Sequence, residues 1–166
     1  ISEDEMIRRN NEELVATWGN LVQRVFTQIN NNFSKINEID EANDIDKKLL
    51  QEMSESFEIV GQLIEKVELK TSLQESMRYV SKVNGYLNET EPWKVIKEDE
   101  KRAGRILYTA LQAIDSCANL LYPFMPTTSD LVRSAIPRET NNSWGLNKIK
   151  TGVELKEIGL LFNKFD

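Results

Sequence analysis

The sequence has no histidine and only one cysteine, Cys117, among its 166 residues. Without imidazole the chain lacks the commonest metal ligand and the usual general base of Ser-His and Cys-His nucleophile pairs. A lone cysteine forms no internal disulfide, and without histidine it cannot complete a set of zinc ligands, so we expect no metal site. We also find no pair of carboxylates whose context favours acid–base catalysis. Much of enzyme chemistry is thereby excluded.

Long apolar runs are missing as well, since none approaches the roughly 18 residues that a membrane-spanning helix needs. The sequence shows no basic leader with an apolar centre and a cleavage site. Its 40% hydrophobic and 29% charged residues are ordinary for a globular protein, and its length fits one domain. We therefore expect a cytoplasmic protein that makes no contact with a membrane.

Net positive charge is also lacking, because the formal net charge is −6. Indiscriminate binding to nucleic acid comes mainly from a dense basic surface that releases counterions from phosphates, so any contact with nucleic acid must be local. Acidic residues concentrate between positions 40 and 58, and we interpret them as a solvated face. The following basic residues could form a basic face elsewhere: Arg8, Arg9, Arg24, Lys94, Lys97, Lys101, Arg102 and Arg105.

Apolar residues recur at intervals of three and four along most of the chain, which is typical of amphipathic helices. We predict an all-α protein, an antiparallel bundle of about five helices. The predicted helices cover about 7–33, about 45–67, about 73–87 after a Thr71 or Ser72 cap, about 101–122, and a stretch ending near 137 after a Thr127 or Thr128 cap. No alternation typical of strands is found.

The whole chain, residues 1–166, is predicted to be a single helical domain. Its last part, 138–166, has a loop-like composition and an apolar tail, Gly159–Phe165, so we expect it to pack back onto the bundle. Trp18 lies on the apolar side of the first predicted helix, and Trp144 lies in a loop that could cover the core. We interpret both indoles as structural.

Two short segments carry side chains suited to unpaired nucleotides. Asn20 and Arg24 stand four residues apart in the first predicted helix, so an amide and a guanidinium project from one face and can read base edges. Asn88 to Pro92 should end the third helix, with Glu91 extended because a proline follows. Trp93 then stands where a new helical turn begins, and an indole there can stack on a base. We expect the indole to share one exposed site with the other two side chains.

Each of these residues also has a structural interpretation. Large aromatic side chains are usually mostly buried, so Trp93 could fill a gap between helices. Arg24 could form a surface ion pair, and Asn20 could be an incidental polar residue. Lys94 and Lys97 either contact phosphate, which gives salt-sensitive affinity without base preference, or belong to a solvated face.

Four groups of residues resemble, in order, segments of the helical anticodon-binding domain of methionyl-tRNA synthetase, and the resemblance extends over nearly the whole chain. They are Arg8–Asn11 with Glu13–Leu14 and Gly19–Arg24; Val83–Tyr86 with Glu91–Lys94 and Lys97; Leu120–Pro126; and Leu161–Lys164. The resemblance implies a class I synthetase anticodon-binding domain that recognises the methionine anticodon of a tRNA. It further implies that Trp93 stacks on the first anticodon base, while Asn20 and Arg24 form hydrogen bonds with the anticodon bases.

The resemblance also implies which parts of the enzyme are not in this chain. Neither signature motif of the class I catalytic fold is found, so we expect that this chain alone does not aminoacylate tRNA. The catalytic domain, which would use ATP and Mg²⁺, is expected in the same polypeptide of the full-length enzyme. We expect no cofactor in this domain.

Two alternatives remain open on the sequence. The first is the equivalent helical domain of another class I synthetase, such as the leucyl, isoleucyl, valyl or cysteinyl enzyme. The second is a helical module that binds a protein through an apolar groove, with Trp93 as the anchor. An apolar interface predicts binding that depends weakly on salt, whereas phosphate contacts lose affinity steeply as salt rises.

Overall fold

The computed structural model describes residues 2–36, 39–156 and 158. Within these residues the helices are α1 (Glu3–Asn32), α2 (Asp44–Glu65), α3 (Leu69–Thr90), α4 (Pro92–Val95), α5 (Glu100–Leu121) and α6 (Pro126–Ala135). The same residues contain no strand, only isolated bridges that pair Lys35 with Glu154 and Arg138 with Ile149. The prediction of an all-α bundle of about five helices is confirmed, with α4 as an additional single turn.

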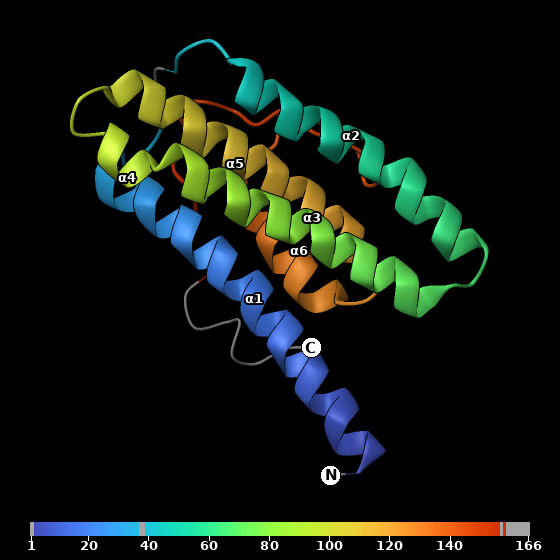
Figure 1. Cartoon of the computed structure of the whole chain (residues 1–166). Helices are drawn as coiled ribbons and strands as arrows, with labels where there is room; N and C mark the ends of the chain where they lie inside the picture. Colours follow the sequence, from blue (N-terminus) through green and yellow to red (C-terminus); the bar gives the residue numbers. More distant parts are fainter. Residues whose placement is uncertain (1, 37–38, 157, 159–166) are drawn as a thin grey trace.

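Helix α5 forms the centre of the bundle. It contacts α1, α2, α3, α4 and α6, and every residue from Thr109 to Leu121 is buried. This stretch is buried all round although it is not apolar all round, because Gln112, Asp115 and Asn119 form hydrogen bonds with residues of the segment after α6. Helix α1 lies along α3 and α5, and its N-terminal half extends beyond the bundle (Figure 1).

The helix starts depend on capping residues that the sequence only partly revealed. Asn43 caps α2 in a capping box, in which the Asn43 side chain accepts from the Asp46 backbone and the Asp46 side chain accepts from the Asn43 backbone. The predicted caps of α3 and α6 are wrong. Helix α3 begins at Leu69, and the hydroxyl of Ser72 donates to the Leu69 carbonyl from inside the helix. Helix α6 begins at Pro126, since a proline needs no N–H partner in the first turn.

The junction between α3 and α4 is a single residue, Glu91. It has φ 48° and ψ 59°, so the prediction that it is extended is wrong. Its N–H donates to the carbonyl of Leu87 at 2.9 Å, which completes the last turn of α3 in the left-handed conformation common at helix ends. The chain then turns directly into α4 at Pro92.

The acidic segment 40–58 is not a solvated face throughout, because Asp46 is fully buried. Its carboxylate accepts from Arg102 of α5 and from the hydroxyl of Tyr86 of α3. Burial by itself raises the pKa of Asp46, but the hydrogen bonds from Arg102, Tyr86 and the Asn43 backbone outweigh it and hold the pKa below its usual value. Arg105 likewise donates to the carbonyl of Asp40, so part of the predicted basic face serves packing.

The segment after α6 contacts the bundle at several polar points. The Arg138 guanidinium lies 2.8 Å from the Asp115 carboxylate of α5, and the Asn147 amide donates to the same carboxylate at 3.0 Å. Trp144 donates to the carbonyl of Phe57 at 3.0 Å and packs edge-to-face on its ring. The predicted packing of the tail 159–165 lies outside the described residues, and the assignment of 1–166 to one domain stays a prediction.

Over the described ranges, no helix combines the length and the apolar character that crossing a membrane requires. Over the same ranges, no three His, Cys, Asp or Glu side chains are grouped so as to bind a metal ion.

Candidate nucleic-acid interface

Trp93 lies at the rim of the bundle, in the one-turn helix α4. Pro92 is buried and fixes the start of this turn, and α4 packs against α5. The indole is half-buried and contacts the edge of the hydrophobic core. It is therefore neither an interior side chain nor a fully solvated one.

Arg24 of α1 lies directly over this indole. Its Cζ atom is 4.7 Å from the centroid of the Trp93 ring, and its Nη2 atom donates to Oδ1 of Asn88 at 3.0 Å. The partners found for Arg24 are thus an indole and a neutral amide rather than the carboxylate of a surface ion pair. Such a cation–π contact contributes about 0.5–1 kcal/mol at an exposed site. Helices α1, α3 and α4 meet at this cluster of Arg24, Asn88 and Trp93.

Asn20 is exposed on α1, one helical turn before Arg24. Four residues of α-helix advance about 6 Å along the axis, so its amide projects beside the guanidinium on the same side of α1. The structure thus brings Arg24 and Trp93 into contact and leaves Asn20 exposed one helical turn before Arg24, with no side-chain hydrogen bond to either in the described part of the chain. The assignment of base-binding roles to these side chains stays a prediction.

The two lysines follow the indole closely. Lys94 is exposed, and its Nζ atom lies 2.8 Å from Oε2 of Glu91. Since exposed ion pairs contribute only about 0–1 kcal/mol, a phosphate could replace this partner at little cost. Lys97 is exposed just after α4. Both positions are compatible with contacts to the backbone of a nucleic acid bound at Trp93.

Asn88 is the member of the cluster that sequence reasoning missed. It stands in the last turn of α3, where the sequence pattern indicates only that a helix is ending. Its helical position alone could have placed it near the Pro92-Trp93 turn, but its contact with Arg24 depends on how α1 packs against α3. The packing of these two helices is tertiary structure, which the local sequence pattern does not reveal.

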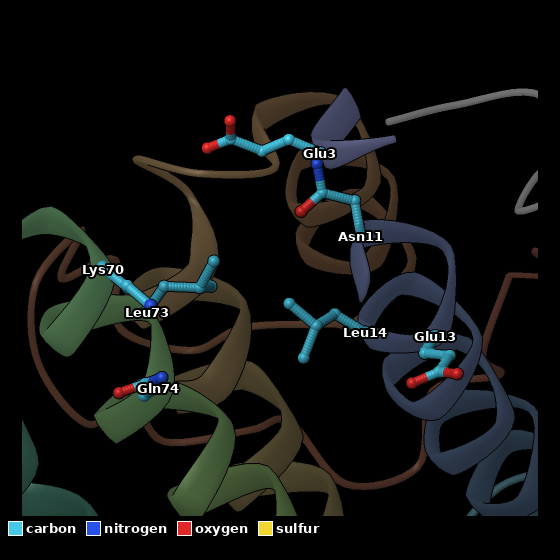
Figure 2. Close-up of a pocket in the computed structure, with 7 residues that line it drawn as sticks. All are labelled: Glu3, Asn11, Glu13, Leu14, Lys70, Leu73 and Gln74. Carbon is cyan, nitrogen blue, oxygen red and sulfur yellow. The ribbon is translucent and has the colours of Figure 1, made fainter. Parts of the chain in front are cut away.

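A separate cavity of about 500 Å³ lies between the N-terminal half of α1 and the start of α3. Figure 2 shows Leu14 and Leu73 facing it from opposite helices. Its other lining residues are Glu3, Asn11, Glu13, Lys70 and Gln74. It lies toward the beginning of α3, whereas Trp93 follows the end of α3 (Figure 1), so this cavity and the predicted base-binding site are distinct.

Comparisons with known proteins agree on one family. Residues 36–166 match the model of the anticodon binding domain of methionyl tRNA ligase, a range that includes Asn88 and Trp93 but not α1. A methionine–tRNA ligase of Bifidobacterium adolescentis is 48% identical over 134 residues, which are 80% of this chain and 22% of the relative. The methionine–tRNA ligase of Bifidobacterium longum strain NCC 2705 is 45% identical over 156 residues, which are 93% of this chain and 24% of the relative.

Solved structures share the fold. The apo form of Mycobacterium tuberculosis methionyl-tRNA synthetase has a TM-score of 0.80 at 21% identity, over 94% of this chain and 33% of that one. The same enzyme bound by methionyl-adenylate has a TM-score of 0.81 at 21% identity, over 94% of this chain and 32% of that one. This chain spans about a fifth to a quarter of the length of the curated relatives described above. The chain belongs to the family of anticodon-binding domains of methionyl-tRNA ligases, which confirms the resemblance found in its sequence.

Proposed function

We propose that this domain binds the anticodon loop of a tRNA that carries the methionine anticodon. In this proposal an unpaired base stacks on the part of the Trp93 ring that Arg24 leaves uncovered, while Asn20 and Arg24 form hydrogen bonds with base edges. The observation that carries the proposal is the contact between Arg24 and Trp93, with Cζ 4.7 Å from the ring centroid. A half-buried indole and a cation are thereby held together, and the exposed Asn20 precedes the cation by one turn of α1.

Single-stranded loops are the part of an RNA that proteins read by sequence, because their bases can leave the stack and present their pairing edges. Stacking on an aromatic side chain contributes about 1–3 kcal/mol per base but hardly distinguishes one base from another. Discrimination must then come from directional donors and acceptors, which the amide and the guanidinium supply. Trp93 provides affinity in this scheme, and Asn20 and Arg24 provide specificity.

The charge of the chain is compatible with such local recognition. Arg102 pairs with the buried Asp46, and Arg105 donates to the Asp40 backbone, so neither guanidinium is free to follow an RNA strand. Lys94 and Lys97 lie next to the indole and are exposed. We propose that these two lysines contact phosphates of the loop, and that the salt dependence of binding is accordingly modest.

The wider assignment follows the family. We propose that the full-length protein is a cytoplasmic methionine–tRNA ligase, whose catalytic domain lies in the same polypeptide and uses ATP and Mg²⁺, while this domain itself uses no cofactor. The identity to methionine–tRNA ligases, 48% with the enzyme of Bifidobacterium adolescentis, supports this enzyme over its leucyl, isoleucyl, valyl and cysteinyl counterparts.

The test compares the binding of two anticodon stem-loops, one with the methionine anticodon and one changed at the first anticodon base. Trp93→Leu keeps an apolar side chain but removes the stacking surface, so we expect affinity for both loops to fall by about 5- to 100-fold. Trp144→Leu is the matched control, because Trp144 is also partly exposed but contacts Phe57 instead. Equal affinities of the Trp93→Leu and wild-type proteins would exclude the stacking role. If the affinity for the stem-loops depended neither on the salt concentration nor on the anticodon, the alternative function would be favoured, in which the domain binds a protein through an apolar groove.

A further inference from the structure

Asn88 is an exposed residue in the last turn of α3, and its side chain forms a hydrogen bond with Arg24 of α1. Its Oδ1 atom accepts from Nη2 of Arg24 at 3.0 Å, across the packed pair of helices α1 and α3. The same guanidinium lies over the ring of Trp93. The Asn88 amide therefore holds Arg24 from one side while the indole holds it from another, and these residues come from three helices.

Fixing this guanidinium has a physical consequence for binding. A free arginine side chain populates many rotamers, and immobilising it on binding costs free energy. A guanidinium that is already in place avoids most of that cost, and its planar fork keeps its other N–H donors at fixed angles. One of its five N–H groups is directed to Asn88, and in the proposed complex the donors that meet a base or a phosphate are among the other four.

The neutrality of the Asn88 acceptor also matters. A carboxylate in its place would accept the same hydrogen bond but would cancel the charge of Arg24 and repel nearby phosphates. An amide positions the guanidinium without neutralising it. The positive charge therefore stays available beside Trp93 in a protein whose net charge is −6.

We propose that Asn88 is a positioning residue for anticodon recognition, which fixes the Arg24 guanidinium over Trp93 through a neutral hydrogen bond. This inference rests on the proposed function of the site. It assigns to Asn88 an effect that is exerted entirely through Arg24 and that requires no contact between Asn88 and the RNA.

A double-mutant cycle tests this dependence. The proteins are wild type, Asn88→Ala, Arg24→Ala and the double variant, each titrated with the methionine-anticodon stem-loop and with the loop changed at its first anticodon base. We expect Asn88→Ala to lower the preference for the correct loop by roughly three- to tenfold, the size of one hydrogen bond. In the Arg24→Ala background the same change should have less than a twofold effect. Gln62→Ala, which removes another exposed amide near the end of α2, should have no effect.

The outcomes separate this inference from the proposed function. If Arg24→Ala and Trp93→Leu both bind like wild type, the proposed function is wrong and this inference falls with it. If they weaken binding but Asn88→Ala does not, only this inference is overturned. Multiplicative effects of Asn88→Ala and Arg24→Ala would also overturn it, because they would show that the two residues act independently.

Asn88→Asp separates positioning from a merely structural role. The carboxylate keeps the acceptor oxygen, so we expect the preference for the correct loop to be largely retained. The added negative charge should weaken binding to both loops at low salt, and the deficit should shrink as the salt concentration rises. The thermal midpoints of both variants should stay close to wild type because Asn88 is exposed. A loss of preference in Asn88→Asp equal to that in Asn88→Ala would overturn the inference.

Discussion

Asp46 and Arg102 form a two-point ion pair, with Nη1 2.7 Å from Oδ2 and Nη2 2.9 Å from Oδ1, that joins the first turn of α2 to the first turn of α5. The hydroxyl of Tyr86 donates to the same carboxylate from α3. Burial raises the pKa of Tyr86, and the hydrogen bond to Asp46 raises it further, so this hydroxyl stays protonated and remains a donor. Three helices are thus tied together at one buried carboxylate.

We expect Asp46→Asn to lower the free energy of unfolding by about 2–4 kcal/mol at neutral pH, because it leaves the Arg102 charge without its counterion in a partly buried place. The folded-state pKa of Asp46 is depressed, so the carboxylate stabilises the fold above its unfolded pKa of about 4 and loses that contribution as the pH falls through the folded pKa. The difference between variant and wild type in urea unfolding should therefore shrink below about pH 4.

The pKa of Asp115 is shifted in the opposite direction to that of Asp46, so the pH dependence must be read from the difference between variant and wild type. Burial raises the pKa of Asp115 above its usual value, against the opposing charge of Arg138 and the hydrogen bond from Asn147. Its contribution to stability is therefore present in acid and falls as the pH rises through the folded pKa. Asp115 is unchanged in both proteins, so its effect cancels in the difference. A difference that stays constant from pH 7 down to pH 3 would contradict the role given to Asp46.

Lys94→Gln and Lys97→Gln should weaken binding of the stem-loop without changing the preference between anticodons. Each lysine that contacts a phosphate of a single strand contributes about 0.7 to the slope of log affinity against log salt concentration. We expect each variant to lower the slope by about that amount, measured by titration at several salt concentrations. Lys66→Gln, an exposed lysine at the end of α2, is the control. A slope that neither variant alters would place the phosphates elsewhere.

Glu91→Gly should raise the free energy of unfolding by about 0.5 kcal/mol. The left-handed conformation at φ 48° costs a residue with a Cβ roughly 1–2 kcal/mol, and glycine adopts it freely but loses more entropy on folding. The lost ion pair with Lys94 is exposed and weak. Glu91→Val, which adds a branched Cβ, should instead destabilise by about 1 kcal/mol in the same urea experiment. If Glu91→Gly destabilised the protein more than Glu91→Val, the strain assigned to this junction would be refuted.

Cys117 should be unreactive in the folded protein. It is fully buried in α5, and burial raises the pKa of its thiol well above the usual value, with the nearby Asp115 charge adding to the effect. The thiolate is the reactive form, so a maleimide should label Cys117 only as fast as the protein unfolds. Adding urea should raise the labelling rate in parallel with the unfolded fraction. Rapid labelling in native buffer would show that this part of α5 opens locally.

The sequence predicted the helices well because their apolar periodicity is strong, as α5 illustrates: 101–122 was expected and Glu100–Leu121 is found. The predicted caps of α3 and α6 are wrong because Thr and Ser also occur inside helices, and a helix can begin at a proline or through packing without a side-chain cap. The burial of Asp46 was missed for another reason. Charge density along the chain does not reveal which face of α2 meets α3 and α5.

The candidate site was predictable in its parts and not in its connections. Arg24 and Trp93 carried chemical signals of their own, a helical amide–guanidinium pair and an indole after a proline. Asn88 carried none, since an asparagine near a helix end is an ordinary feature. The role proposed for Asn88 becomes visible only when α1 is packed beside α3, because its amide then accepts a hydrogen bond from the guanidinium of Arg24, 64 positions earlier in the chain.

The single-residue junction at Glu91 makes the direction of the indole depend on the length of the preceding helix. Each residue added to an α-helix turns whatever follows by about 100° and advances it by about 1.5 Å. With no loop between α3 and α4 to absorb such a change, one extra residue near Asn88 would swing the ring away from the guanidinium without altering either side chain. Spacing at this corner is therefore as decisive for the orientation of Trp93 as the aromatic side chain itself.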